Sequence, residues 1–137
     1  MTPVTLQPMR LVLVATVVFA LAGAAMGPAA TSPRDRLTIT VWPQGRGVGK
    51  PVSSARLNCH PPGGSHPRPA KACRRLFAHR DALKPVPPTS MCLGIYGGPR
   101  VAYVRGQIAG RRVRAWLNRK NSCEIKRWDA LGIVLRP

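Results

Sequence analysis

The chain has 137 residues, with 22 lysines and arginines against 4 aspartates and glutamates, so its formal net charge is +18 at pH 7. The few carboxylates and 3 histidines form no recognisable nucleophile or metal motif, so we expect neither an enzyme nor a bound cofactor. These residues are Asp35, Asp81, Glu124, Asp129, His60, His66 and His79. The length corresponds to one domain.

The positive charge is spread along the chain rather than gathered in one tract. Doublets occur at Arg74-Arg75, Arg111-Arg112 and Arg119-Lys120, but there is no lysine- and arginine-rich run and no basic motif interleaved with aromatic residues. The sequence therefore predicts no specific nucleic-acid partner. A generic attraction to anionic surfaces remains, because it depends only on net charge.

The N-terminus has the pattern of a secretory signal peptide. Arg10 precedes an apolar run over residues 11–22, and small residues follow the run. This run is shorter than the roughly 20 residues that span a bilayer, so we expect cleavage rather than a membrane anchor. Cleavage is expected between residues 24 and 30. Residues 1–30 are then the signal peptide, and residues 31–137 are a secreted, extracellular domain that does not contact the membrane.

Two strands are predicted at the start of this domain. Residues 37–42 alternate between apolar and polar side chains, which is the pattern of a half-buried strand. Pro43 and three nearby glycines end the strand, and alternation resumes over residues 52–59. No helix and no Lys-Ser/Thr pair follow the glycines, as a phosphate-binding loop would require. We therefore interpret them as a turn between antiparallel strands.

A helix is predicted over residues 67–83, after a rigid proline- and glycine-rich loop at residues 61–64. Its inner stripe contains Cys73, Leu76, Phe77 and Leu83. One proline fits the first turn of this helix and another marks its end. The proline-rich run over residues 84–89 should keep the next segment extended at the surface.

The remaining apolar segments predict three more strands, over residues 101–104, 113–117 and 131–135. Gly106 and Gly110 join the first two of them. No alternation of strand and helix suggests a parallel sheet. The predicted fold class is therefore α+β, a two-layer structure in which an antiparallel sheet of about five strands packs with one longer and one short helix.

Four cysteines lie in the predicted mature domain: Cys59, Cys73, Cys92 and Cys123. An exported domain of this size buries a small core, so we expect two disulfides to supplement it. None of the cysteines forms a closely spaced C-x₂₋₄-C pair, which argues against zinc, and we predict no metal site. The residues alone leave three pairings of the four cysteines open.

Several short segments within residues 37–135 share their order and spacing with one known family. They are Leu57-Asn58-Cys59, Gly64-Ser65-His66-Pro67-x-Pro69, Ala72-Cys73, Ala82-Leu83, Met91-Cys92, Ile95-Tyr96, Gly110-Arg111-Arg112-Val113 and Asn121-Ser122-Cys123-Glu124. In these segments the chain resembles the Streptomyces-type subtilisin inhibitors, small secreted proteins that block serine proteases by a substrate-like standard mechanism. The resemblance implies the sequential disulfides 59–73 and 92–123, a serine protease of the subtilisin or trypsin/chymotrypsin type as partner, and a homodimer.

The resemblance also implies a reactive loop that begins at the third cysteine. Cys92 stands at P3, the third residue before the scissile bond, and Leu93, Gly94, Ile95 and Tyr96 follow as P2, P1, P1′ and P2′. The tyrosine that the family carries at P2′ coincides with Tyr96 without a gap. The expected scissile bond is therefore Gly94–Ile95.

This loop departs from the family pattern at its glycines. Family members commonly place a large apolar or basic residue at P1, whereas Gly94 leaves the S1 pocket of the protease unfilled. Gly97-Gly98 is expected to add slack on the primed side. A register shifted by one residue, with Leu93 in the S1 pocket, is the alternative. We therefore expect a weak inhibitor or one of unusual specificity.

Asn121 is the expected support of the loop. It stands at the position of a family asparagine that hydrogen-bonds the loop backbone, so the resemblance implies that it braces the loop from beneath. From the residues alone, a helix cap or a turn would be the preferred role of this asparagine.

A second function is open on the same scaffold, that of a diverged cationic module that binds cell-wall polymers, lipid head groups or nucleic acid. The two functions predict different sensitivities. Inhibition should depend on residues 92–96 and survive salt. Binding through the basic surface should ignore Gly94 and weaken steeply as the ionic strength rises.

Overall fold

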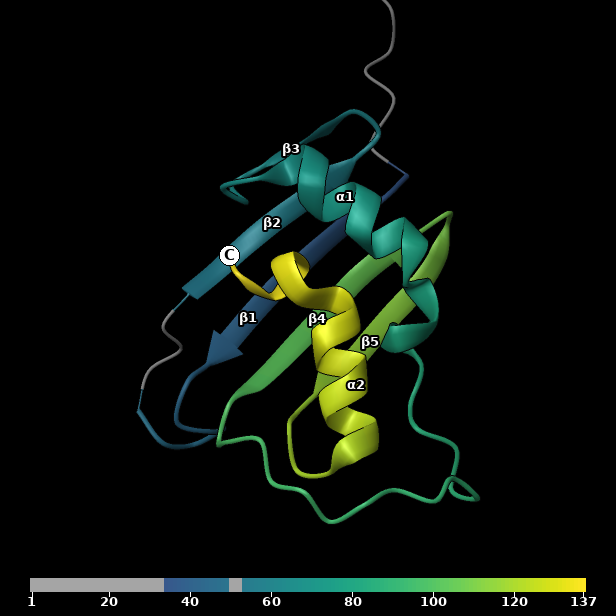
Figure 1. Cartoon of the computed structure of the whole chain (residues 1–137). Coiled ribbons are helices and arrows are strands. Elements are labelled where there is room, and N and C mark those ends of the chain that lie inside the picture. The colour runs from purple at the N-terminus through teal and green to yellow at the C-terminus, as the bar shows by residue number, and fades with distance from the viewer. Residues whose placement is uncertain (1–33, 50–52) are drawn as a thin grey trace, which may run out of the picture. The chain divides into compact units, whose positions relative to one another are not determined.

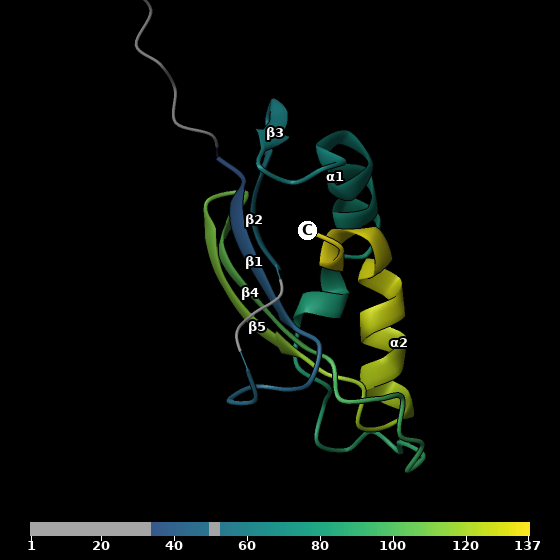
Figure 2. The ribbon, with the colours of Figure 1, turned by 90° about the vertical axis from the view of Figure 1, so that its left-hand side faces the viewer.

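The computed structural model describes residues 34–49 and 53–137, in which a five-stranded antiparallel sheet carries helices on one face (Figures 1 and 2). The predicted signal peptide lies outside the described residues. The strands are β1 (Arg36–Trp42), β2 (Ser53–Cys59), β3 (Pro62–Gly64), β4 (Val101–Ile108) and β5 (Arg111–Leu117). Their order in the sheet is β3-β2-β1-β4-β5. The predicted α+β fold class is confirmed.

The strands form where apolar and polar residues alternate, because one face of the sheet is buried. In β1 the side chains of Leu37, Ile39 and Val41 are buried, while those between them are half-buried or exposed. β4 and β5 form a hairpin whose two turn residues, Ala109 and Gly110, both have positive φ, at 49° and 75°. This backbone is typical of the two-residue turns whose twist matches that of the paired strands.

Two helices and two 3₁₀ segments cover the inner face of the sheet (Figure 2). They are α1 (Pro69–Ala78), η1 (Arg80–Leu83), α2 (Ser122–Leu131) and η2 (Gly132–Leu135). The helix predicted over residues 67–83 is therefore found as α1 and η1, interrupted at His79. None of the described helices is long and apolar enough to cross a membrane.

Two local predictions were wrong. Residues 131–135 are not a strand, because they complete α2 and form η2. Trp128, Leu131, Val134 and Leu135 are buried at helical spacing, and a short apolar run does not by itself distinguish the two structures. The loop predicted over residues 61–64 contains a strand, since β3 pairs with β2.

The core lies between the sheet and the helices. Leu37, Ile39 and Leu57 of the sheet are almost fully buried, and so are Leu76 of α1 and Leu131 of α2. The residues that follow η1 and those that precede α2 lie at the edge of this core. They form the surface described next.

Candidate functional site

Residues 84–100, between η1 and β4, form the longest described stretch without helix or strand. The segment crosses the end of the sheet near the start of α2 (Figure 1). Of the six large apolar side chains that are exposed among the described residues, four belong to it: Met91, Leu93, Ile95 and Tyr96. Exposed apolar side chains gathered on one loop are typical of a surface that binds a partner.

The Cys92–Cys123 disulfide ties this segment to the first turn of α2, with Cα atoms 5.4 Å apart. The second disulfide, Cys59–Cys73, ties the end of β2 to α1, with Cα atoms 5.5 Å apart. The sequential pairing that the resemblance implied is therefore confirmed. Position 92 of the loop is fixed covalently to the body of the domain.

Ser122 holds the residue after Cys92 by two hydrogen bonds. The Ser122 amide donates to the Leu93 carbonyl oxygen, and the Leu93 amide donates to Ser122 Oγ, both over 2.9 Å. The backbone of Leu93 is therefore saturated by one residue of α2, although its side chain is 68% exposed.

Arg119 holds the far side of the same segment. The Gly97 amide donates to the Arg119 carbonyl oxygen over 2.7 Å, and Arg119 Nε donates to the Gly97 carbonyl oxygen over 2.8 Å. A Cβ at position 97 would stand 2.9 Å from Ile125 Cδ1 and 3.0 Å from Arg119 Nε. The expectation that Gly97 makes the loop more flexible is therefore wrong, because this glycine lets the loop approach α2 closely. Gly98, with φ of 108°, makes no comparable contact.

Gly94 lies in the open between these two anchors. Apart from its chain neighbours, no heavy atom lies within 4 Å of the position where its Cβ would stand. Leu93 and Ile95 on either side are exposed. The loop thus brings together residues 92–96 as one surface, held at both ends and free of contacts at Gly94.

Asn121 lies at the start of α2, and the support of the loop that the resemblance implied for it stays a prediction. Its Oδ1 accepts a hydrogen bond from the Glu124 amide over 2.9 Å, which makes it the N-cap of α2. The described hydrogen bonds to the loop backbone come instead from Ser122 and Arg119. The sequence did not predict this role for either residue, because each uses one backbone group and one side-chain group whose partners depend on the fold.

Asp35 and His60 lie at the other end of the sheet from the loop, since β1 starts where β4 ends. Asp35 is buried, its Oδ1 accepts from the Ala109 amide over 2.6 Å, and its other oxygen contacts His60 Nδ1. Burial opposes ionisation of Asp35, but the Ala109 amide, the His60 ring and Arg34 outweigh it and lower the pKa of the carboxyl below 3.8. This group stabilises the β4–β5 turn.

The other carboxylates pair with basic side chains, as Asp81 with Lys84, Glu124 with Arg127, and Asp129 with Arg119. His66 is buried before α1, where its Nδ1 accepts from the Arg68 amide. Burial lowers the pKa of His66, with smaller opposing contributions from nearby backbone groups. Over residues 34–49 and 53–137, no group of three or more His, Cys, Asp or Glu side chains could hold a metal ion.

Comparison with known proteins bears on this loop. The family model described as subtilisin inhibitor-like matches residues 33–120, which include the loop but not α2. A search of curated proteins finds no match. Among solved structures, the chain is similar to Streptomyces caespitosus sermetstatin, determined in complex with Bacillus licheniformis subtilisin. Identity is 24% over 72% of this chain and 94% of sermetstatin, with a TM-score of 0.49.

Proposed function

The chain belongs to the subtilisin inhibitor-like family, a family of protease inhibitors rather than enzymes, and from this premise we propose that it inhibits serine proteases through residues 92–96. The segment would bind in the protease cleft as a substrate does and offer the Gly94–Ile95 bond to the nucleophile. The proposed partner is a serine protease of the subtilisin or trypsin/chymotrypsin type.

The observation that carries this proposal is the two-sided anchoring of an exposed segment. Cys92 and Leu93 are held by α2, Gly97 is held by Arg119, and Gly94 stands free between them. A loop that is ordered before binding loses little conformational entropy in the complex. After cleavage, the same anchors would keep the two new ends close together, so that religation competes with release.

The exposed backbone around Gly94 suits the way proteases recognise extended peptides. Such a peptide adds a short strand to the cleft, where main-chain hydrogen bonds supply affinity and side-chain pockets supply specificity. In the proposed complex Leu93 occupies S2 and Ile95 occupies S1′. The four exposed apolar side chains of the loop would lose contact with water, which favours binding.

Gly94 sets the expected strength of inhibition. An empty S1 pocket forfeits about 1.5 to 3 kcal/mol of side-chain burial, and glycine adds roughly 0.5 to 1 kcal/mol of backbone entropy to be lost. The sum of about 2 to 4 kcal/mol corresponds to an affinity lower by a factor on the order of 30 to 1,000. We therefore propose weak inhibition, or a target whose S1 pocket is very small or blocked.

We further propose that the protein acts outside the cell, after removal of residues 1–30. This part of the proposal is supported by the leader pattern and by the two disulfides, which persist in oxidising compartments. The homodimer implied by the resemblance also stays a prediction, to be checked by sedimentation of the secreted protein.

The test is a titration of subtilisin, trypsin, chymotrypsin and an elastase-like protease with the oxidised secreted protein and its Gly94→Met and Gly94→Lys variants. Gly94→Met should strengthen inhibition of subtilisin and chymotrypsin, and Gly94→Lys that of trypsin, by a factor on the order of 30 to 1,000. Val48→Ser is the matched control, because Val48 is an exposed apolar residue on a different loop. It should leave all four inhibition constants unchanged.

Prolonged incubation with protease identifies the bond. Cleavage at the proposed position yields a new N-terminus at Ile95, whereas the shifted register with Leu93 in S1 yields one at Gly94. The proposed function is wrong if neither the natural protein nor any Gly94 variant inhibits any of the four enzymes.

A further inference from the structure

Basic side chains border the exposed apolar loop on its primed side, the part that follows the proposed scissile bond. We call Arg100, Lys120 and Lys126 the basic rim. All three are exposed, and none forms an ion pair with a carboxylate among the described residues. Residues 84–100 contain no aspartate or glutamate. The basic rim is therefore a positive border beside an apolar centre.

Lys126 is placed next to the loop by the helix that holds the loop. It lies on α2, one turn after Ser122. With Ile95 and Ser122 it lines a hollow of about 610 Å³, and with Ser90 and Cys123 it lines a second hollow of about 340 Å³. Two hollows beside the loop thus share this residue. In the proposed register, Lys126 is a neighbour of the P1′ residue Ile95.

Lys120 and Arg100 lie farther along the primed side. Lys120 follows Arg119, whose backbone and side chain hold Gly97. The Lys120 amide donates to Asn118 Oδ1 over 3.0 Å, which helps to fix the backbone there. Arg100 directly precedes β4 and ends the loop. The basic rim therefore accompanies P1′, the third residue after the bond, and the residues beyond it.

The carboxylates of the chain do not neutralise the basic rim. The sequence has 4 of them, and each contacts another group: Asp35 contacts the Ala109 amide and His60, Asp81 contacts Lys84, Glu124 contacts Arg127, and Asp129 contacts Arg119. Counter-charge for the basic rim can therefore come only from solvent ions or from a partner.

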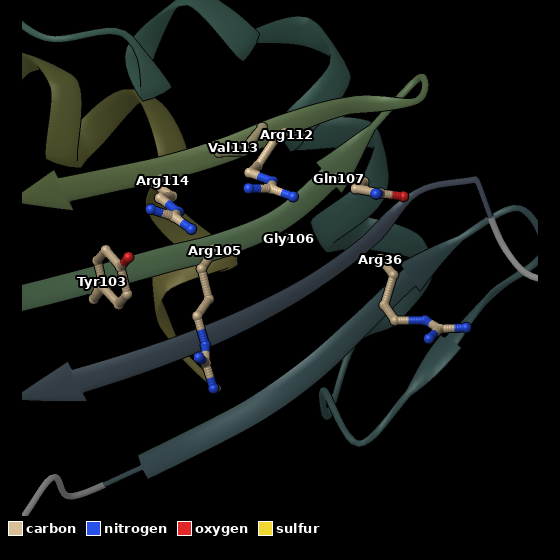
Figure 3. A pocket seen from close by; sticks show the side chains of 8 residues that line it. All are labelled: Arg36, Tyr103, Arg105, Gly106, Gln107, Arg112, Val113 and Arg114. Carbon is tan, nitrogen blue, oxygen red and sulfur yellow. The ribbon is translucent and has the colours of Figure 1, made fainter.

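A larger group of cations lies elsewhere, on the face of the sheet turned away from the helices. Figure 3 shows this group around a hollow of about 470 Å³, with the side chains of Arg36, Arg105, Arg112 and Arg114. Arg105 is five residues along β4 from Arg100, about 17 Å in an extended strand. These arginines add to the overall positive field of the protein, but they do not border the loop.

We propose, on the premise of the proposed inhibitory function, that the partner is a serine protease with carboxylates bordering the primed side of its cleft. Binding interfaces combine an apolar centre with a polar rim, and the exposed apolar side chains of residues 91–96 supply the centre. Rim charges of opposite sign steer two proteins together and act mainly on the association rate. A protease with a basic border would be repelled.

Such steering would offset part of the weakness that Gly94 causes. Electrostatic attraction can raise association rates about 10- to 1,000-fold, and the empty S1 pocket lowers affinity by a factor of similar size. The inhibitor would then discriminate between proteases by the charge around the cleft rather than by the side chain at P1.

The test uses the oxidised secreted Gly94→Met protein and three forms of subtilisin. These are the natural enzyme and two variants in which a pair of residues bordering the primed side of the cleft is replaced by glutamates or by lysines. Stopped-flow inhibition at about 0.1 M salt, where charges act over about 10 Å, measures the association rate. Association should be about 10-fold faster or more with the glutamate form than with the lysine form. The difference should vanish at about 1 M salt, where charges act over about 3 Å.

Two double variants in the same background locate the charges on the inhibitor. Lys120→Gln/Lys126→Gln should slow association with the glutamate form about 3- to 10-fold and leave dissociation nearly unchanged. The matched control Arg68→Gln/Lys71→Gln removes the same charge from exposed residues at the start of α1. Figures 1 and 2 show the start of α1 at the opposite end of the domain from the loop, so the control should change association less than about 2-fold. Thermal unfolding of each variant checks that the fold is intact.

Three results would overturn the inference. Equal association with all three subtilisins would mean that the basic rim does not meet the border of the cleft. Equal losses in the two double variants would assign the attraction to net charge alone. Either result, obtained with a protein that inhibits, would leave the proposed function standing. Absence of inhibition by every form of the protein, Gly94→Met included, would overturn the proposed function and this inference with it.

Discussion

Ser122 and Leu93 exchange two hydrogen bonds, one through the Ser122 amide and one through Ser122 Oγ, each 2.9 Å long. The pair joins the first turn of α2 to the residue before Gly94. Because Cys123 carries the adjacent disulfide, two consecutive residues of α2 hold two consecutive residues of the loop. The geometry of the proposed reactive bond thus depends on where α2 begins.

Loss of the Ser122 hydroxyl should therefore weaken inhibition. Ser122→Ala removes the acceptor of the Leu93 amide, at a cost of about 0.5 to 1.5 kcal/mol, which corresponds to an inhibition constant about 2- to 10-fold higher. Ser122→Thr keeps the hydroxyl and should restore most of the loss. Ser90→Ala, in the same segment, is the control and should have little effect. Equal inhibition by the alanine and threonine variants would argue against this contact.

Gly97→Ala should disturb the second attachment of the loop, the pair of hydrogen bonds between Gly97 and Arg119. Its Cβ would meet Ile125 at 2.9 Å and Arg119 Nε at 3.0 Å, so the loop must move away from α2. Such overpacking typically costs about 1 to 3 kcal/mol, and we expect inhibition about 5- to 150-fold weaker. Gly63→Ala is the matched control, because its Cβ also meets open space and it lies in β3, outside the loop.

A double variant tests whether Ile125 is the obstacle. In the Gly97→Ala/Ile125→Ala protein the added methyl group has room, so the two substitutions should couple by at least about 0.5 kcal/mol in a double-mutant cycle of inhibition constants. Strictly additive effects would mean that Gly97 is needed for a reason other than space.

The fold could be predicted from the sequence where burial on one face imposes a period. Leu37 and Ile39 fall two residues apart because alternate side chains of β1 enter the core, and this pattern is visible without a structure. The run over residues 131–135 is buried as a short helical segment, and its composition suits a strand equally well. There the tertiary fold decided between two structures that local sequence allowed.

The candidate site was predictable only in part. The position of residues 92–96 followed from the third cysteine and from Tyr96 through the family resemblance. The roles of Ser122 and Arg119 could not be predicted, because each bonds to the loop through one backbone group, which every residue carries, and one side-chain group whose partner is set by the fold. For Asn121, the residues alone predicted the helix cap that the structure shows.

Removing each disulfide in turn should show that both stabilise the fold but that only one is needed for inhibition. Chain-entropy arithmetic for sequence separations of 31 and 14 gives about 3.7 kcal/mol for Cys92–Cys123 and about 3 kcal/mol for Cys59–Cys73. Replacing either pair with serine should therefore lower the free energy of unfolding in urea by similar amounts. Only loss of the first pair should turn the inhibitor into a substrate.

Mass spectrometry of protease digests can check this difference. The Cys92→Ser/Cys123→Ser protein should be cut rapidly within residues 92–96, whereas the Cys59→Ser/Cys73→Ser protein, at a temperature where it is folded, should resist. Rapid cleavage of both would show that global unfolding, rather than loss of the loop anchor, exposes the bond.

Asp35 should make stability depend on pH in the acid range. Its pKa is lower in the folded protein than the ordinary 3.8, since the Ala109 amide, the His60 ring and Arg34 outweigh the opposing effect of burial. The ionised carboxylate therefore contributes stability that is fully present above the unfolded pKa and is lost as the pH falls through the lower folded pKa. Asp35→Asn should cost about 1 to 3 kcal/mol near neutral pH, because a charged, buried acceptor is removed.

Urea unfolding of both proteins between about pH 7 and pH 3 measures this contribution. The difference in unfolding free energy should be constant down to about pH 5 and should shrink below about pH 4, because the unfolded natural protein then takes up a proton on Asp35 that the folded protein does not yet bind. Asp81→Asn is the control, because the Asp81–Lys84 pair is exposed and such pairs contribute little. A difference that stays constant to pH 3 would contradict the lowered pKa of Asp35, since the gap is independent of pH only when the carboxyl has the same pKa in the folded and the unfolded protein.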